Sequence, residues 1–156
     1  MNQQLQQEIQ ATQEKLKKLQ EKLESSKVTI ENAPVGAVLP DGCIVVERYK
    51  DSILIAAPES TGVKCTWTPE FKDVFTSLKN HGFNPSQWHV PSQEELQLTY
   101  KNCKEQFSSA FYWSSTENSS MDAFGVRLGD GRSNGCLKTY ACHVRAFRCV
   151  YLGFEL

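Results

Sequence analysis

Trp88-His89-Val90-Pro91-Ser92-Gln93-Glu94-Glu95-Leu96 is the stretch that decides how the middle of the chain folds. Ser92 after a proline, with Glu95 three residues later, predicts a helix that begins with a capping box. Apolar residues then recur at helical spacing. They predict the buried face of this helix, which consists of Leu96, Tyr100, Cys103 and Phe107.

A second helix is expected just before this stretch. Thr68 is a candidate N-cap, Pro69 suits the first helical position, and Gly82 suits the end. The apolar residues between them fall on one helical face, namely Phe71, Val74, Phe75 and Leu78.

Strands are expected on both sides of the helices. The β-branched runs 44–46 and 53–57 read as a hairpin through residues 49–52. Phe124, Val126 and Leu128 alternate with Ala123, Gly125 and Arg127, which predicts a strand with one buried face. Residues 141–151 are apolar on both faces and predict one interior strand. This order indicates an α+β domain, with helices segregated from a mostly antiparallel sheet.

Residues 1–31 differ from the rest, because they contain no aromatic residue, glycine or proline. Their apolar residues follow spacings of four and three, which predicts a coiled-coil stalk. The expected seam contains Leu5, Ile9, Leu16, Leu19, Leu23 and Ile30, with Thr12 and Ser26 between them. A single helix packed on its own domain is the alternative, but the stripe is narrow for that role. We therefore expect a stalk over 1–31, a linker over 32–35 and a head over 36–156.

Composition excludes several classes of protein. The chain has 156 residues, 40% of them hydrophobic, and a formal net charge of −1. These values fit a soluble globular protein with no general affinity for nucleic acid. No run approaches the length of a membrane span, and the first residues do not form a secretory signal, so neither membrane insertion nor export by the general pathway is expected.

The six cysteines are therefore expected to be reduced core thiols, not disulfides. Cys136, Cys142, His143 and Cys149 form the only local cluster, and its spacing matches no common zinc pattern. We expect no metal and no cofactor.

No catalytic signature stands out. The histidines at 81, 89 and 143 are scattered, and the serine-rich run 114–120 reads as a hydrogen-bonded loop. Trp67, Trp88 and Trp113 are either core residues or a platform for a sugar ring, and core is the preferred interpretation for Trp88 and Trp113.

Charge is uneven near the C-terminus. Between residues 123 and 150 there is one acidic residue, Asp130, against five basic ones: Arg127, Arg132, Lys138, Arg145 and Arg148. They are either ordinary surface and buried cations or a surface for an anionic partner such as an acidic polysaccharide.

Residues 88–96 also resemble the W-x-[LV]-P-[ST]-x-x-E-[LW] element of a large bacterial and phage family. That family includes the C-terminal domain of the Legionella collagen-like adhesin and the Fibrobacter succinogenes major paralogous domain. Residues 112–117 match its YWSSTE motif, and residues 56–59 and 144–148 match its beginning and its closing strand. Ala123, Val126, Lys138 and the turn 129–131 follow at the usual distances.

The resemblance implies a C-type-lectin-like head, with two helices on a mostly antiparallel sheet. It also implies a non-enzymatic adhesin or receptor-binding domain, often trimeric on a fibrous stalk. Since calcium-ligand motifs of true lectins are not found in the sequence, calcium-independent recognition is expected. With the stalk and no export signal, we expect a homotrimeric phage tail-fibre or baseplate tip, made in the host cytoplasm and carried in the virion. It would attach to other tail proteins through its stalk.

Recognition is expected on the loops between Glu117 and Lys138, because polar residues there interrupt the apolar alternation. The candidate ligand-binding residues are Asn118, Ser119, Ser120, Asp122, Arg127, Arg132, Ser133 and Asn134. The expected ligand is a host cell-surface glycan or protein. Alternatives are a secreted bacterial adhesin fragment at the cell surface, a structural virion decoration, and an oxidase similar to formylglycine-generating enzymes. The last rests on a faint likeness at Cys136, Cys142 and Phe147-Arg148-Cys149.

Overall fold

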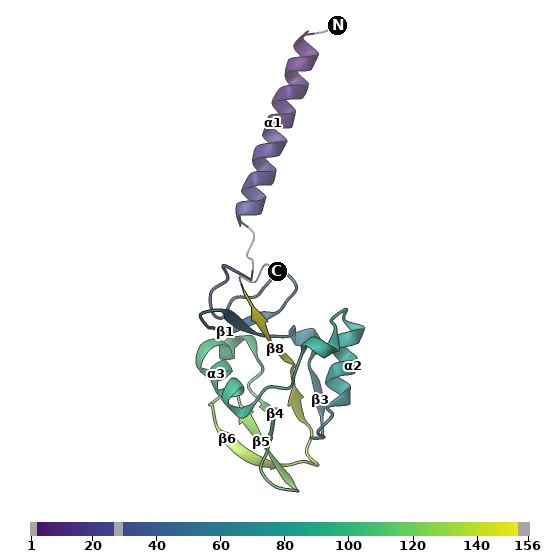
Figure 1. Ribbon diagram of the computed structural model, residues 1–156, viewed down its shortest axis with the longest axis vertical. Helices are drawn as coiled ribbons and strands as arrows, with labels where there is room; N and C mark the ends of the chain where they lie inside the picture. Colours follow the sequence, from purple (N-terminus) through teal and green to yellow (C-terminus); the bar gives the residue numbers. More distant parts are fainter. Residues whose placement is uncertain (1–2, 27–29, 153–156) are drawn as a thin grey trace.

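The computed structural model describes residues 3–26 and 30–152, with side chains described for residues 3–21 and 30–152. Three α-helices, eight strands and three short 3₁₀ turns occur in these ranges (Figure 1). The helices are α1 (Gln3–Ser26), α2 (Lys72–Asn80) and α3 (Gln93–Cys103), and the turns are Glu59–Thr61, Pro85–Gln87 and Lys104–Gln106. The strands are β1 (Ile44–Arg48), β2 (Ser52–Ala56), β3 (Val63–Cys65), β4 (Phe111–Glu117), β5 (Asp122–Arg127), β6 (Ser133–Leu137), β7 (Cys142–Val144) and β8 (Phe147–Tyr151).

The strands form two sheets where one was expected. The first has the order β1-β2-β8 and the second β3-β7-β4-β5-β6. All strand pairs are antiparallel except β4 with β7, which meet in parallel at Tyr112 and His143. The predicted α+β class with mostly antiparallel strands is therefore confirmed, and so is the β1–β2 hairpin.

Apolar side chains of the head pack into two buried clusters. One apolar cluster contains Trp113, Val45 and Leu78, and a second contains Leu96, Val126 and Phe147, all with essentially no solvent exposure. Helix α3 begins as expected, since Ser92 Oγ accepts from Glu95 N and Ser92 N donates to the Glu95 carboxylate, completing the capping box. This helix packs between the two sheets, against β1, β4 and β5.

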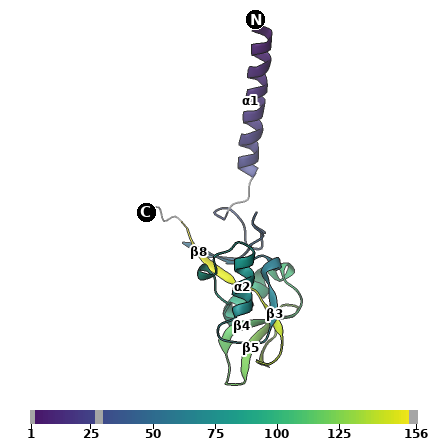
Figure 2. The ribbon, with the colours of Figure 1, turned by 90° about the vertical axis from the view of Figure 1, so that its right-hand side faces the viewer.

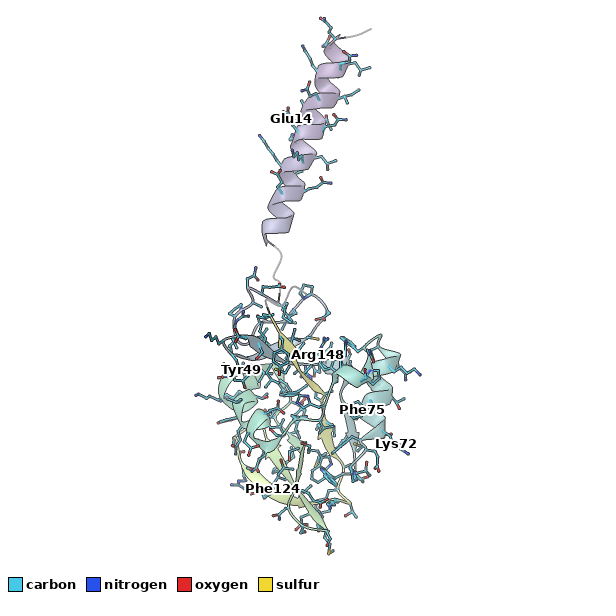
Figure 3. The ribbon with its side chains drawn as sticks, in the orientation of Figure 1. Glu14, Tyr49, Lys72, Phe75, Phe124 and Arg148 are labelled. Atoms are coloured by element: carbon cyan, nitrogen blue, oxygen red, sulfur yellow. The ribbon has the colours of Figure 1, made fainter. Side chains whose placement is uncertain are left out.

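Helix α1 stands away from the head (Figures 1 and 3). Its seam residues remain exposed in the single chain, with Leu5 44%, Leu16 55% and Leu19 61% accessible. The Leu23 side chain lies outside the described residues, whereas Ile30 is half-buried against the head. A helix packed on its own domain would cover these leucines, so the narrow stripe is left without an intramolecular partner in the described chain.

The chain enters the head through contacts made by one arginine. The Arg48 guanidinium donates to the carbonyl oxygens of Ile30, Glu31 and Ala33 at 3.1, 2.8 and 2.6 Å. Ala33, expected in the linker, is buried in the core. Residues 30–33 are thus held at the end of the head formed by the β1-β2-β8 sheet.

Helix α2 starts later than predicted. Phe71 N donates to the carbonyl and hydroxyl oxygens of Thr68, so residues 68–71 form a turn. Phe71 takes a left-handed conformation (φ 45°), which places its ring edge-on against Trp67, and the helix begins at Lys72. Pro69 is therefore outside the helix, whereas Gly82 follows its end with φ 85°, as the sequence predicts.

The expected strand over residues 141–151 is wrong, because it divides between the two sheets. β7 lies between β3 and β4, whereas β8 is the edge of the other sheet beside β2. Arg145 sits between them, with its Nε donating to Ala57 O at 2.6 Å and its Nη1 to Gln106 O at 3.0 Å. The alternation predicted for β5 also fails, since Ala123 and Val126 are both fully buried, in different clusters.

Candidate ligand-binding site

The predicted recognition residues separate into two groups at opposite ends of β5. Asn118, Ser119 and Ser120 lie in the β4–β5 connection, whereas Arg132 lies in the β5–β6 connection. Asp122 and Arg127 are the first and last residues of β5. At about 3.3 Å per residue, these ends are roughly 16 Å apart. Ser133 and Asn134 belong to β6 and not to a loop, so the structure does not gather the eight residues on one surface.

The β4–β5 connection is held by its own hydrogen bonds. Ser119 Oγ accepts from the backbone nitrogens of Met121 and Asp122 at 3.2 and 3.1 Å. Lys138 Nζ donates to Ser120 O and pairs with Glu117 Oε2 at 2.8 Å. These contacts give an exposed but ordered turn.

The β5–β6 connection packs against α3. Gln93 Nε2 donates to Ser133 Oγ, and a side chain at Gly131 would collide with the Tyr100 ring at 2.7 Å. Gly131 also has φ 78°, so both its conformation and its surroundings require glycine. The Ser133 hydroxyl is therefore already hydrogen-bonded within the fold.

A depression of about 850 Å³ lies between β6, the segment leading into β7, and the start of β4. Its apolar surface includes Phe111, Leu137 and Tyr140, of which Tyr140 is 59% exposed. Its polar groups include Lys64, Asp122, Asn134 and His143. We call this depression the distal groove. Asp122 and Asn134 are the members of the predicted set that line it.

The distal groove lies far from the point where the chain enters the head. Figures 1 and 2 place β4 and β5 at the end opposite helix α1. Figure 3 shows Tyr49 and Arg148 in the half of the head nearer to α1 and Phe124 in the far half. A ligand in the groove would therefore be bound at the tip of the molecule.

Two cysteines also line the distal groove, and burial changes their acidity. Burial raises the pKa of Cys142 to about 11, and it also raises the pKa of Cys136, with the Asp122 carboxylate adding to the effect. Both thiols are thus protonated at neutral pH. All six cysteines are free, and Cys43, Cys103 and Cys142 are buried as core residues.

The basic residues near the C-terminus do not form one anion-binding surface. Arg145 is only 2% exposed and lies over the Phe107 ring at 4.2 Å. Arg127 is within 3.7 Å of Asp130, and Lys138 is paired with Glu117. Three of the five basic residues are thus buried or paired, which favours the interpretation of this run as ordinary surface and buried cations.

The tryptophans belong to the core. Trp113, Trp88 and Trp67 are 0%, 7% and 8% exposed. Trp113 Nε1 donates to Cys65 O and Trp67 Nε1 to Ser114 O, each at 2.8 Å. The core interpretation of Trp88 and Trp113 is confirmed, and Trp67 joins them, so a sugar platform made of these indoles is excluded.

Two further kinds of feature are absent from the described residues. Within residues 3–26 and 30–152, no helix combines the length and apolar character needed to cross a membrane. In the same part of the chain, no three His, Cys, Asp or Glu side chains converge in a way that could hold a metal ion.

Neither the models of known protein families nor the curated proteins compared with this chain gives a match.

Sequence reasoning missed Tyr140, Leu137, Phe111, Lys64 and His143 as groove residues. Tyr140 and Leu137 carried a usable signal, because large apolar residues flank Lys138 where no helix or strand pattern requires them. Phe111, Lys64 and His143 carried none, since only the β3–β7–β4 pairing brings them together.

Proposed function

We propose that this protein is a non-enzymatic receptor-binding or adhesion module, with a C-type-lectin-like head on a trimeric coiled-coil stalk. In this proposal it is the tip of a phage tail fibre or baseplate, carried in the virion, and its stalk attaches it to other tail proteins. Its distal groove recognises a host cell-surface ligand without calcium. The single observation that carries the proposal is the position of the groove, at the end of the head opposite the chain entry.

The helix supports the trimeric part of the proposal. Leu5, Ile9, Leu16 and Leu19 are 44–61% exposed along one seam, and burying a leucine or isoleucine stabilises by about 1.5–3 kcal/mol. Association of several copies removes these side chains from water. It would also present several grooves together, so weak individual binding is strengthened by avidity.

The lining of the groove favours a glycan as ligand. The exposed ring of Tyr140 and the half-buried ring of Phe111 offer apolar faces for a sugar ring. Asn134 and Asp122 supply a donor and acceptors for hydroxyl groups, and Lys64 adds a cation for a charge-assisted hydrogen bond. This mixture of a few polar groups on an apolar surface is typical of small-ligand sites.

The formylglycine-type oxidase is the second candidate, because Cys136 and Cys142 line the same groove. The raised pKa values of both thiols weigh against it, since a nucleophilic cysteine needs its thiolate. Copper-dependent oxidation of a cysteinyl peptide, lost in Cys136→Ser, would favour the oxidase instead. A secreted bacterial adhesin at the cell surface would use the same groove, whereas a structural virion decoration would not need it.

The test measures binding of the full chain to a glycan microarray and to intact bacteria. Tyr140→Ala combined with Asn134→Ala should reduce binding at least tenfold, because both side chains line the groove and neither is buried. The matched control is Tyr49→Ala, which removes a tyrosine of similar exposure (49%) at the stalk-proximal end.

Tyr49→Ala and added EDTA should both leave binding unchanged. Wild-type binding by the Tyr140→Ala, Asn134→Ala variant would refute the distal groove as the binding site. Loss of binding in EDTA would refute calcium independence. Absence of binding to any glycan or cell would favour the structural decoration.

A further inference from the structure

Cys65 and Cys142 lie directly opposite each other in the β3–β7 ladder. Directly paired residues of antiparallel strands point to the same face of the sheet, with Cα atoms about 4.5–5.5 Å apart. A disulfide needs a Cα separation of about 4.4–6.8 Å. The backbone of this pair therefore already has the spacing that a disulfide requires, although both thiols are free.

The ladder around the pair is short but well fixed. Val63 pairs with Val144 and Lys64 with His143, so the register of Cys65 against Cys142 is set by two preceding pairs. Trp113 Nε1 donates to Cys65 O at 2.8 Å, which holds the β3 side of the pair to β4.

The two thiols differ in access to solvent. Cys65 is half-buried and lines an open cavity of about 280 Å³ beside Thr66 and Asp73. Cys142 is 8% exposed and lines the distal groove. An oxidant in solution would therefore meet Cys65, the more exposed of the two, first.

We propose that Cys65 and Cys142 are a site of reversible disulfide formation, which takes a small disulfide such as oxidised glutathione as its oxidant. The Cys65 thiolate attacks one glutathione sulfur, and one glutathione leaves as its thiolate. The Cys142 thiolate then attacks the Cys65 sulfur of the mixed disulfide and releases the second glutathione. Two protein thiols and one glutathione disulfide thus give one protein disulfide and two glutathione thiols, and two electrons pass to glutathione.

The pKa values of the two thiols explain why both remain reduced when oxidation is slow. Burial, and then the Asp73 carboxylate, raises the pKa of Cys65, and burial raises the pKa of Cys142 to about 11. Since only the thiolate attacks, the exchange is slow at neutral pH and accelerates as the pH rises. The new bond would join β3 to the β7 wall of the distal groove.

The experiment incubates the reduced chain with oxidised glutathione at pH 8.5, blocks the remaining thiols and digests with trypsin. Each cysteine falls in its own tryptic peptide, and those of Cys65 and Cys142 are residues 65–72 and 139–145. We expect these two peptides to be linked, with the protein running as a single chain on a non-reducing denaturing gel. The thermal midpoint should rise by roughly 5–10 °C on oxidation, because the bond closes a long loop.

Two pairs of variants identify the residues. Cys65→Ser and Cys142→Ser should each abolish the link and the oxidation-dependent rise in the midpoint. Cys136→Ser and Cys149→Ser should retain both. A link from 139–145 to the Cys136 peptide (133–138) would overturn the pairing, and so would six free thiols in the folded chain under conditions that oxidise the urea-unfolded chain. None of these readouts depends on ligand binding, so the result is independent of the proposed function.

Discussion

Leucine side chains are buried in the head but exposed on helix α1. Leu96 of helix α3 is completely buried against the strands of the head, whereas Leu19 of helix α1 is 61% exposed in the single chain. The head therefore has a core that one chain completes, and the helix has a seam that one chain leaves open. Under the proposed function, one chain is enough to fold the head, and the seam of α1 is buried only by further copies.

Removing a core side chain from the head should cause the largest loss of stability, and the same change on helix α1 should cause none in the head. Trp113→Ala deletes a fully buried indole and its hydrogen bond to Cys65 O, and we expect a loss of about 3–5 kcal/mol in the free energy of unfolding. Urea denaturation followed by circular dichroism measures it. Leu19→Ala should leave the transition of the head unchanged. A loss below about 1 kcal/mol in Trp113→Ala would mean that the head is not packed as described.

Substitution of Arg48, at the boundary between helix α1 and the head, is expected to have a smaller effect on stability. Arg48→Gln removes the bonds from its guanidinium to the carbonyl oxygens of Ile30, Glu31 and Ala33. We expect a loss of about 1–2 kcal/mol, with faster amide exchange confined to residues 30–36. Arg132→Gln, an exposed arginine in the β5–β6 connection, is the matched control and should change neither quantity. Equal exchange rates in both variants would show that Arg48 does not anchor the chain entry.

Substitution of Glu95 at the start of helix α3 should have the smallest effect on stability, and this effect depends on pH. Burial acts to raise the pKa of Glu95, but hydrogen bonds from His89 and Ser92 outweigh it, so the pKa lies below its usual value of 4.5. The stabilisation is thus present above about pH 4.5 and is lost as the pH falls through the lowered pKa.

Glu95→Gln should cost about 1 kcal/mol or less at pH 7 and should flatten the dependence of stability on pH below 4.5. Glu94→Gln changes an exposed neighbour in the same turn and should retain the wild-type dependence. Identical acid profiles for the two variants would mean that the Glu95 carboxylate does not act through the capping box.

Local signals in the sequence predicted local structure well. The capping box at Ser92 and Glu95, the β1–β2 hairpin and the helix end at Gly82 each depend on a few neighbouring residues, so their patterns are complete in the sequence. The exposed seam of α1 was also predictable, because its spacing repeats over two heptads from Leu5 to Leu19.

Features that depend on distant partners were not predictable. Residues 141–151 read as one apolar run, and only the contacts of Arg145 with Ala57 and Gln106 show why the strand divides there. The candidate residues from Asn118 to Asn134 are close in sequence, but β5 separates them in space. The distal groove adds Lys64 to residues more than forty positions later, which no local pattern could indicate.

The mass of the full chain in solution, measured by multi-angle light scattering, decides whether copies of the chain share the α1 seam. We expect three times the 17.6 kDa of one chain, because the proposed trimer buries this seam between its helices. Ile9→Asp with Leu16→Asp should give the mass of one chain with the urea transition of the head retained. Gln7→Asp with Gln10→Asp, which adds the same charge away from the seam, should keep the threefold mass. A single-chain mass for the unmodified protein, or a threefold mass for the seam variant, would contradict the account.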